Sequence, residues 1–269
     1  MDFVTETQGI EFKRYDDGSQ GDGLIRIQWR NGEPKLRTAG YFFVSRERLG
    51  DFAPETPWTP CEEVFESGAT TEGYKTEVLK LAIIGVRQQP FIRRESGKYW
   101  LEEYAKGEQG ASLQVDVLCV AEGLQSLGLV VWGSATVKTG FAIVARHDGI
   151  VHQLYQEVLK PAQALAGREF RPWCFWSTIA TERDKGKKVV YTPTQGKPVT
   201  RPVLVLPEKI EKATLNAIYV GKEMVVWGET QRAAYDEWLK ERRTNEPRAS
   251  ESSARKNEPV IVEDADLPF

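Results

Sequence analysis

The sequence predicts a β-rich α+β fold, with one folded domain over residues 1–243 and a disordered tail over residues 244–269. Three observations favour this organisation. Several segments before residue 133 show the alternation or the short apolar runs typical of strands, with Gly-rich turns between them. Residues 150–166 carry apolar side chains at helical spacing instead. Residues 244–262 are rich in Ser, Glu, Arg and Pro and have almost no apolar content, so they cannot offset the entropy of ordering.

The first half of the domain is predicted to consist of strands. Residues 23–30 alternate cleanly, the pair Asn31-Gly32 is a turn signal, and residues 36–44 complete a hairpin. Residues 50–73 are rich in Pro, Thr, Glu and Gly, so we expect a long inserted loop with Trp58 as its aromatic anchor. Further strands are expected over 78–86, 98–104, 113–120 and 127–132.

The second half mixes helices and strands. A short helix is expected over 136–146, and a long one over 150–166 that Gly167 ends. The last helices are expected over 208–217 and 229–243. Strands are expected over 172–179, 188–192 and 201–206, with a turn at Asp184-Lys185-Gly186 between the first two.

Composition and charge restrict the classes of function. The 269 residues carry a net charge of −3, and residues 258–269 hold four acids and no Lys or Arg. The remainder is close to neutral, so a nucleic-acid site must be a local patch. The three cysteines have no paired spacing, which gives neither a disulfide framework nor a zinc motif. The N-terminus does not resemble a signal peptide, and no run of 18 apolar residues occurs, so we expect a cytoplasmic protein.

Basic residues interleave with aromatic ones in segments that suit unpaired nucleic acid, which needs cations for phosphates and flat rings for bases. The first segment offers Arg87, Phe91, Arg93, Arg94, Lys98 and Trp100 around an expected hairpin turn. The second offers Trp173, followed by the basic turn with Arg183, Lys185, Lys187 and Lys188. A third group of candidate residues consists of Arg26, Trp29, Arg30 and Arg37. Each ring can instead belong to the core, and each basic residue can simply solvate a turn.

The sequence contains few patterns that are typical of enzymes. The sequence contains no GxxxxGK[ST] loop, no GxSxG and no HExxH. The adjacent carboxylate pairs Glu62-Glu63 and Glu102-Glu103 would diverge if they lie in strands, which argues against a two-metal centre. We therefore expect a protein that is not an enzyme and that has no cofactor or metal.

The last seven residues combine acids with an apolar end. Glu263, Asp264 and Asp266 precede Leu267, Pro268 and Phe269. This pattern resembles the C-terminal tip of bacterial and phage single-stranded DNA-binding proteins, and the large chain is most similar to the larger replication proteins of this kind from tailed bacteriophages. Ala265 interrupts the acidic run, and the resemblance covers only this short segment. The alternative is an acidic solubilising tail that happens to end in Pro-Phe.

The resemblance implies a fold and a function. It implies an enlarged OB-like barrel that coats single-stranded DNA without reading its sequence during replication, recombination and repair, and a tip (263–269) that recruits enzymes of these processes. It also favours a monomer in the cytoplasm, of the host if the chain is phage-encoded. Two alternatives stay open: a protein that anneals single strands or mediates recombination, and a DNA-processing enzyme such as a nuclease that joins a replisome.

Overall fold

The structure is a computed structural model that describes residues 25–30, 40–64, 68–94, 97–101, 111–124, 130–134, 149–190, 200 and 202–240. For residues 93–94, 97–98, 111–113 and 130–134 it describes the backbone alone. The expected helix over 136–146, the turn at Asn31-Gly32 and the tail over 244–269 lie outside the described residues.

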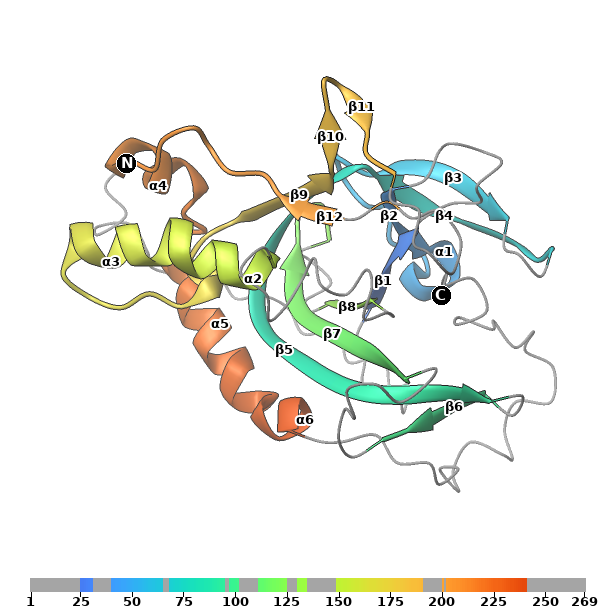
Figure 1. The fold of residues 1–269 in the computed structure, drawn as a ribbon. Helices are drawn as coiled ribbons and strands as arrows, with labels where there is room; N and C mark the ends of the chain where they lie inside the picture. Colours follow the sequence, from blue (N-terminus) through green and yellow to red (C-terminus); the bar gives the residue numbers. More distant parts are fainter. Residues whose placement is uncertain are drawn as a thin grey trace.

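The centre of the molecule is a ten-stranded sheet (Figure 1). Its strands are β1 (Ile25–Arg30), β2 (Tyr41–Ser45), β3 (Thr59–Val64), β4 (Thr70–Thr76), β5 (Val78–Arg94), β6 (Gly97–Trp100), β7 (Ala111–Ala121), β8 (Val130–Ser134), β9 (Ser177–Thr181) and β12 (Pro202–Leu204). They follow the order β12-β9-β5-β7-β8-β1-β2-β4-β3, and β6 pairs with β5. Only β1 and β8 run parallel among these pairs. The fold is thus mixed α+β and rich in strands, and the described strands form no closed barrel.

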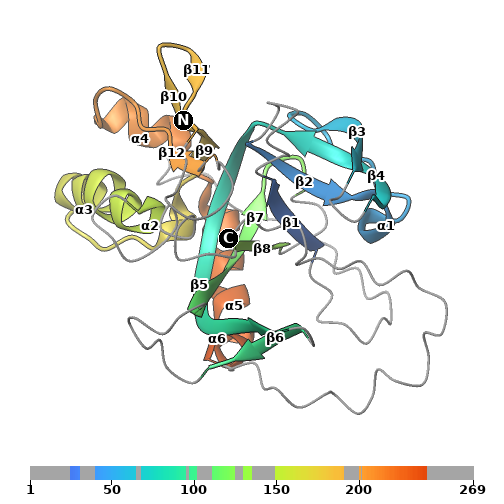
Figure 2. The same cartoon turned by 45° about the vertical axis from the view of Figure 1, so that its right-hand side comes forward.

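One long bent segment holds the sheet together. Only Glu77 separates β4 from β5, so residues 70–94 follow β2 at one end and then β9, β7 and β6 along their length. The register between β5 and β7 shifts at Ile83 and Gly85, and such a bulge bends a strand. Figures 1 and 2 both show β5 as a long curved ribbon that runs from beside β9 down to β6.

Two expected segments are corrected. The long loop over 50–73 is wrong, because this region contains β3 and most of β4, which pair antiparallel. Trp58 is nevertheless an anchor: its ring is buried, and its Nε1 atom donates to the Glu122 carbonyl at 2.8 Å. The strand over 172–179 begins only at Ser177, because Pro172–Cys174 forms a 3-10 helix (η4).

The helices flank both faces of the curved sheet. They are α1 (Arg46–Leu49), α2 (Ile150–Gln153), α3 (Lys160–Ala166), α4 (Lys212–Ile218), α5 (Lys222–Ala234) and α6 (Asp236–Lys240). The expected helix over 150–166 is confirmed as α2 to α3, but its middle, Leu154–Leu159 (η3), is a π-helix. Gly167 ends it with a φ of 65°, in the left-handed conformation that favours glycine.

The alternation of side chains along β5 creates two cores. Leu79, Leu81 and Ile83 belong to the larger core, which the α2–α3 arm covers with residues such as Leu154. Ala82 and Ile84 belong to a smaller core on the other face, beneath α5. Each fully buried aliphatic side chain of this kind stabilises the fold by about 1.5–3 kcal/mol, so the sheet depends on helices from both sides.

In the part of the chain that is described, no helix has both the length and the apolar character needed to cross a membrane.

Candidate nucleic-acid interface

A small basic hairpin projects from the sheet beyond β9. Its strands are β10 (Arg183–Asp184) and β11 (Lys187–Lys188), and it stands clear of the body in Figures 1 and 2. The turn residues Lys185 and Gly186 have φ values of 48° and 79°, and positive φ at both positions is what a two-residue type I′ turn requires. Asn-Gly is the pair usually found there, and Lys185 is the one described residue other than glycine with a positive φ. A lysine held in this disfavoured conformation at an exposed tip is a candidate functional residue.

Glu77 joins this hairpin to the central sheet. Its Oε2 atom lies 2.7 Å from Arg183 Nη2, and its Oε1 atom lies 2.7 Å from Lys188 Nζ. Partial burial tends to raise the pKa of Glu77, but the hydrogen bonds and charges of Lys188 and Arg183 outweigh it and lower the pKa. The Glu77 and Arg183 side chains are about half exposed, so each pair contributes no more than about 1 kcal/mol. These two ion pairs orient the hairpin relative to the sheet, but they are too weak to hold it rigidly.

Two of the predicted DNA-binding arginines are internal instead. The Arg30 side chain is buried, and its Nε atom lies 3.0 Å from Glu63 Oε1. The Arg87 side chain is also buried, with its Nη2 atom 2.7 Å from Asp116 Oδ2. Because a buried carboxylate already neutralises each guanidinium, the expectation that these two arginines contact phosphates is corrected.

Three of the predicted stacking rings belong to the cores. Trp29, Phe91 and Trp173 are at most 4% exposed, so none of them presents a face to an unstacked base. Trp29 Nε1 donates to the Thr200 carbonyl at 3.3 Å, which fixes that ring further. The stacking role expected for these rings is therefore corrected to packing. Trp100 is half-buried, with its ring 5.7 Å from that of Phe91.

A second basic segment occupies the β5–β6 hairpin. The register pairs Arg93 with Lys98 and Arg94 with Gly97, as the predicted turn requires. Tyr99, on β6, is 40% exposed, which makes it the ring on this hairpin that is most accessible in the described structure. Three basic residues and one exposed ring thus occur on the same hairpin.

The candidate residues do not form one patch. The β10–β11 hairpin lies near the start of β5 and the β5–β6 hairpin lies at its other end, and they are well separated in both views (Figure 2). Arg26 is half-buried on β1, which pairs with β8 and β2 and with neither hairpin. Arg37 and the tip residues Glu263, Asp264, Asp266, Leu267, Pro268 and Phe269 lie outside the described residues.

Local spacing in the sequence does not identify the carboxylates that pair with Arg183, Arg30 and Arg87. Glu77, Glu63 and Asp116 lie 106, 33 and 29 positions from Arg183, Arg30 and Arg87. No local spacing indicates such pairs, because they depend on which strands become neighbours and on their register. The one available signal was a lone acid between apolar residues, as at Asp116 in LQVDVLCV.

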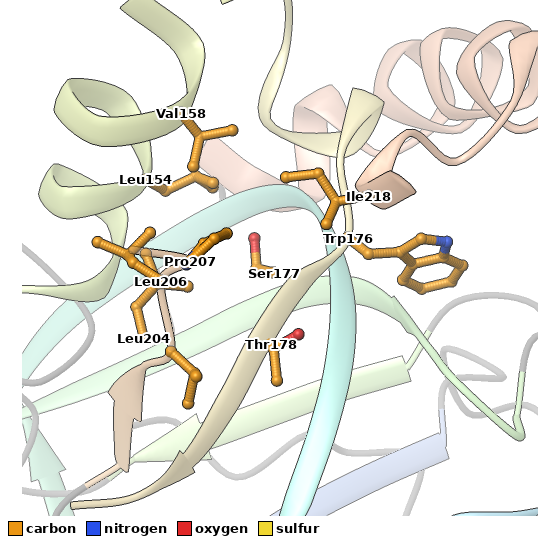
Figure 3. Close-up of a pocket in the computed structure, with 10 residues that line it drawn as sticks. Leu154, Val158, Trp176, Ser177, Thr178, Leu204, Leu206, Pro207 and Ile218 are labelled. Atoms are coloured by element: carbon orange, nitrogen blue, oxygen red, sulfur yellow. The ribbon is translucent and has the colours of Figure 1, made fainter. Parts of the chain in front are cut away.

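An apolar pocket of about 270 Å³ lies apart from these charges (Figure 3). Leu154 and Val158 on η3 face Leu204, Leu206 and Pro207 across it, and Ser177 lies between them. No charged residue lines the pocket, so its chemistry does not suit a phosphate. Among the described residues, no group of three or more His, Cys, Asp or Glu side chains could hold a metal ion.

The interface that this geometry offers is therefore the exposed basic hairpin, with the β5–β6 hairpin as a second contact. Comparison of the chain with protein-family models, with curated proteins and with solved structures found no match.

Proposed function

We propose that this protein binds single-stranded DNA without sequence preference and recruits replication, recombination or repair enzymes through residues 263–269. The observation that carries the proposal is the β10–β11 hairpin, where four basic residues lie within six positions, one of them in the exposed two-residue turn and three beside it. Electrostatic attraction to phosphates provides most of the affinity in binding that does not read sequence. In this proposal the protein acts in the cytoplasm, as a monomer and without catalysis.

Several features support the proposal. The Tyr99 ring and the basic residues of the β5–β6 hairpin could supply the stacking surface and cations that single-strand binding uses. The acids and the apolar end of residues 263–269 resemble the C-terminal tip of single-stranded DNA-binding proteins, which supports a role in partner recruitment. An OB-like barrel remains part of the proposal, and its strands would be β1, β2, the bent β4–β5 segment, β7 and β8, which pair in succession. These strands pair in the order in which they follow one another along the chain, whereas the strands of OB folds have a Greek-key order.

The test is titration of a labelled oligo-dT with the whole chain, followed by fluorescence anisotropy. We expect binding at low salt whose logarithm of affinity falls linearly with the logarithm of salt concentration, by about 0.7 for each phosphate contacted. Anisotropy is preferable to tryptophan quenching, because Trp29, Trp58 and Trp173 are buried. A flat titration at low salt would overturn the proposal. Annealing of complementary strands or metal-dependent loss of the oligonucleotide would instead favour one of the two alternatives.

A further inference from the structure

We infer that Arg183 and Lys188 form a binding site for one phosphodiester group of single-stranded DNA, and that the Glu77 carboxylate occupies this site until the nucleic acid displaces it. This inference rests on the proposed function and adds a regulated phosphate site to it.

The first argument is the chemical likeness between the present occupant and the inferred one. A phosphodiester carries one negative charge shared by two non-bridging oxygens, and a carboxylate does the same. Glu77 directs one oxygen to each cation, at 2.7 Å in both cases. The two cations are therefore already placed to receive two oxygens of a single anion.

The second argument is that the hairpin backbone and the Arg183 guanidinium are held in position by contacts that do not involve Glu77. Arg183 and Lys188 are directly opposite each other in the β10–β11 pair. Arg183 Nη1 also donates to the Gly186 carbonyl at 2.9 Å, and the Val189 amide donates to the Glu182 carbonyl at 2.9 Å at the base of the hairpin. Departure of the carboxylate thus leaves Arg183 held and the backbones of Arg183 and Lys188 opposite each other.

The third argument is access. The side chains of Glu77 and Arg183 are 48% and 45% exposed, whereas that of Lys188 is only 18% exposed. A ligand can approach from the open side of the carboxylate, and water competes less for the more enclosed lysine. The backbone of Glu77 is fixed on both sides, because Thr76 pairs with Phe42 and Val78 pairs with Ala180. Displacement therefore requires only rotation of the Glu77 side chain.

The test compares Glu77→Gln with Glu72→Gln in the full chain, with labelled oligo-dT at low salt as the probe. Both variants remove one negative charge, and Glu72 lies on β4, which ends next to Glu77, and pairs with the exposed Arg46 at 3.3 Å. We expect E77Q to bind about three- to tenfold more tightly than the wild type, with a similar salt slope, because both proteins contact the same phosphate once the Glu77 carboxylate has left the site. E72Q should change little. Equal gains in the two variants, or weaker binding by E77Q, would overturn the inference.

A second measurement separates this inference from the proposed function. Inorganic phosphate is titrated into the isotopically labelled wild type and E77Q, and the side-chain ¹⁵N resonances of Arg183 and Lys188 are followed by NMR. We expect both resonances to shift, at lower phosphate concentration in E77Q. Shifts without any oligo-dT binding would retain the site and remove the proposed function. Oligo-dT binding without these shifts would retain the function and remove the site.

Discussion

The guanidinium carbon of Arg87 lies 3.7 Å from the centre of the Trp238 ring, so a residue of β5 stacks directly on a residue of α6. The same guanidinium donates from Nη1 to the Trp238 carbonyl at 3.2 Å and pairs with Asp116 on β7. Arg87 therefore connects the two longest strands to the last described helix. Its basic character serves the architecture of the protein, and not a ligand.

Replacement of Arg87 by Ala should lower the free energy of unfolding by about 3–5 kcal/mol, because it leaves the buried Asp116 carboxylate without its cation. Urea denaturation followed by circular dichroism measures this. The control is Arg46→Ala, which breaks an exposed pair with Glu72 and should cost less than about 1 kcal/mol. Similar losses in the two variants would show that the Arg87 pair contributes little.

Gly85 should tolerate an added methyl group only if the Leu239 side chain on α6 is shortened. A Cβ atom on Gly85 would lie 2.8 Å from Leu239 Cδ1 and 2.9 Å from Arg232 Nη1. We expect Gly85→Ala to destabilise the protein by about 1–3 kcal/mol through overpacking. Leu239→Ala removes the nearest atoms, so the double variant should be more stable than the sum of the single losses predicts, by about 0.5 kcal/mol or more. Strict additivity in the denaturation series would refute this account of the contact.

Lys185→Asn should preserve the turn conformation and weaken DNA binding. Asn accepts a positive φ more readily than Lys, so thermal unfolding should occur at the same temperature as in the wild type or slightly above it. Loss of the charge should weaken oligo-dT binding and reduce the salt slope by about 0.7. Lys212→Gln, at the exposed start of α4, removes an equal charge far from the turn and should leave affinity unchanged. Equal losses of oligo-dT affinity in the two variants would mean that the net charge of the protein, and not the position of Lys185, determines binding.

The pocket hydroxyl of Ser177 should be dispensable for folding. Its Oγ atom is buried and has no hydrogen-bond partner within the described structure, so Ser177→Ala removes an unsatisfied group and should be neutral or stabilising. Thr181→Val is the contrast: the Thr181 hydroxyl, four residues along β9, donates to the Gly40 carbonyl. That variant should lose about 1 kcal/mol or more in chemical denaturation. A clear loss of stability in S177A would reveal a partner for the hydroxyl.

Neutralisation of the tip should leave DNA binding intact or make it tighter. The amide replacements Glu263→Gln, Asp264→Asn and Asp266→Asn remove charges that compete with phosphates for the basic hairpins, without shortening the chain. Leu267→Ala with Phe269→Ala should not alter affinity, because it retains those charges. Anisotropy with oligo-dT reports both effects. Abolished binding in the triple variant would contradict a tip that serves partner recruitment.

Local patterns predicted much of the secondary structure but little of the sheet. The alternation around Ile27 and Trp29 and the helical spacing around Leu154 are set by neighbouring residues, and both elements are present. β3 was missed because its TPCEEV sequence has mostly exposed side chains and therefore no apolar pattern. The π-helical turn at Leu154–Leu159 also has no signature in the spacing that predicted the helix.

The candidate site was harder to predict, for a physical reason. Arg30 and Arg87 look like surface cations in the sequence, and only the strand register brings Glu63 and Asp116 to them. Phe91 likewise stands among basic residues along the chain, yet it faces the interior. By contrast, the turn at Lys185-Gly186 is a local feature, and its prediction is confirmed.

The parallel contact between β1 and β8 imposes an order on biosynthesis. Ile25 is aligned with Val130, so the first strand leaves the ribosome long before the neighbour that will flank it on one side exists. Until then β1 can pair with β2, which in turn pairs with β4 and through it with β3, but the other edge of β1 has no strand beside it. A nascent chain stalled before residue 130 should consequently retain an open, adhesive edge, and this makes the early intermediate a natural substrate for chaperones.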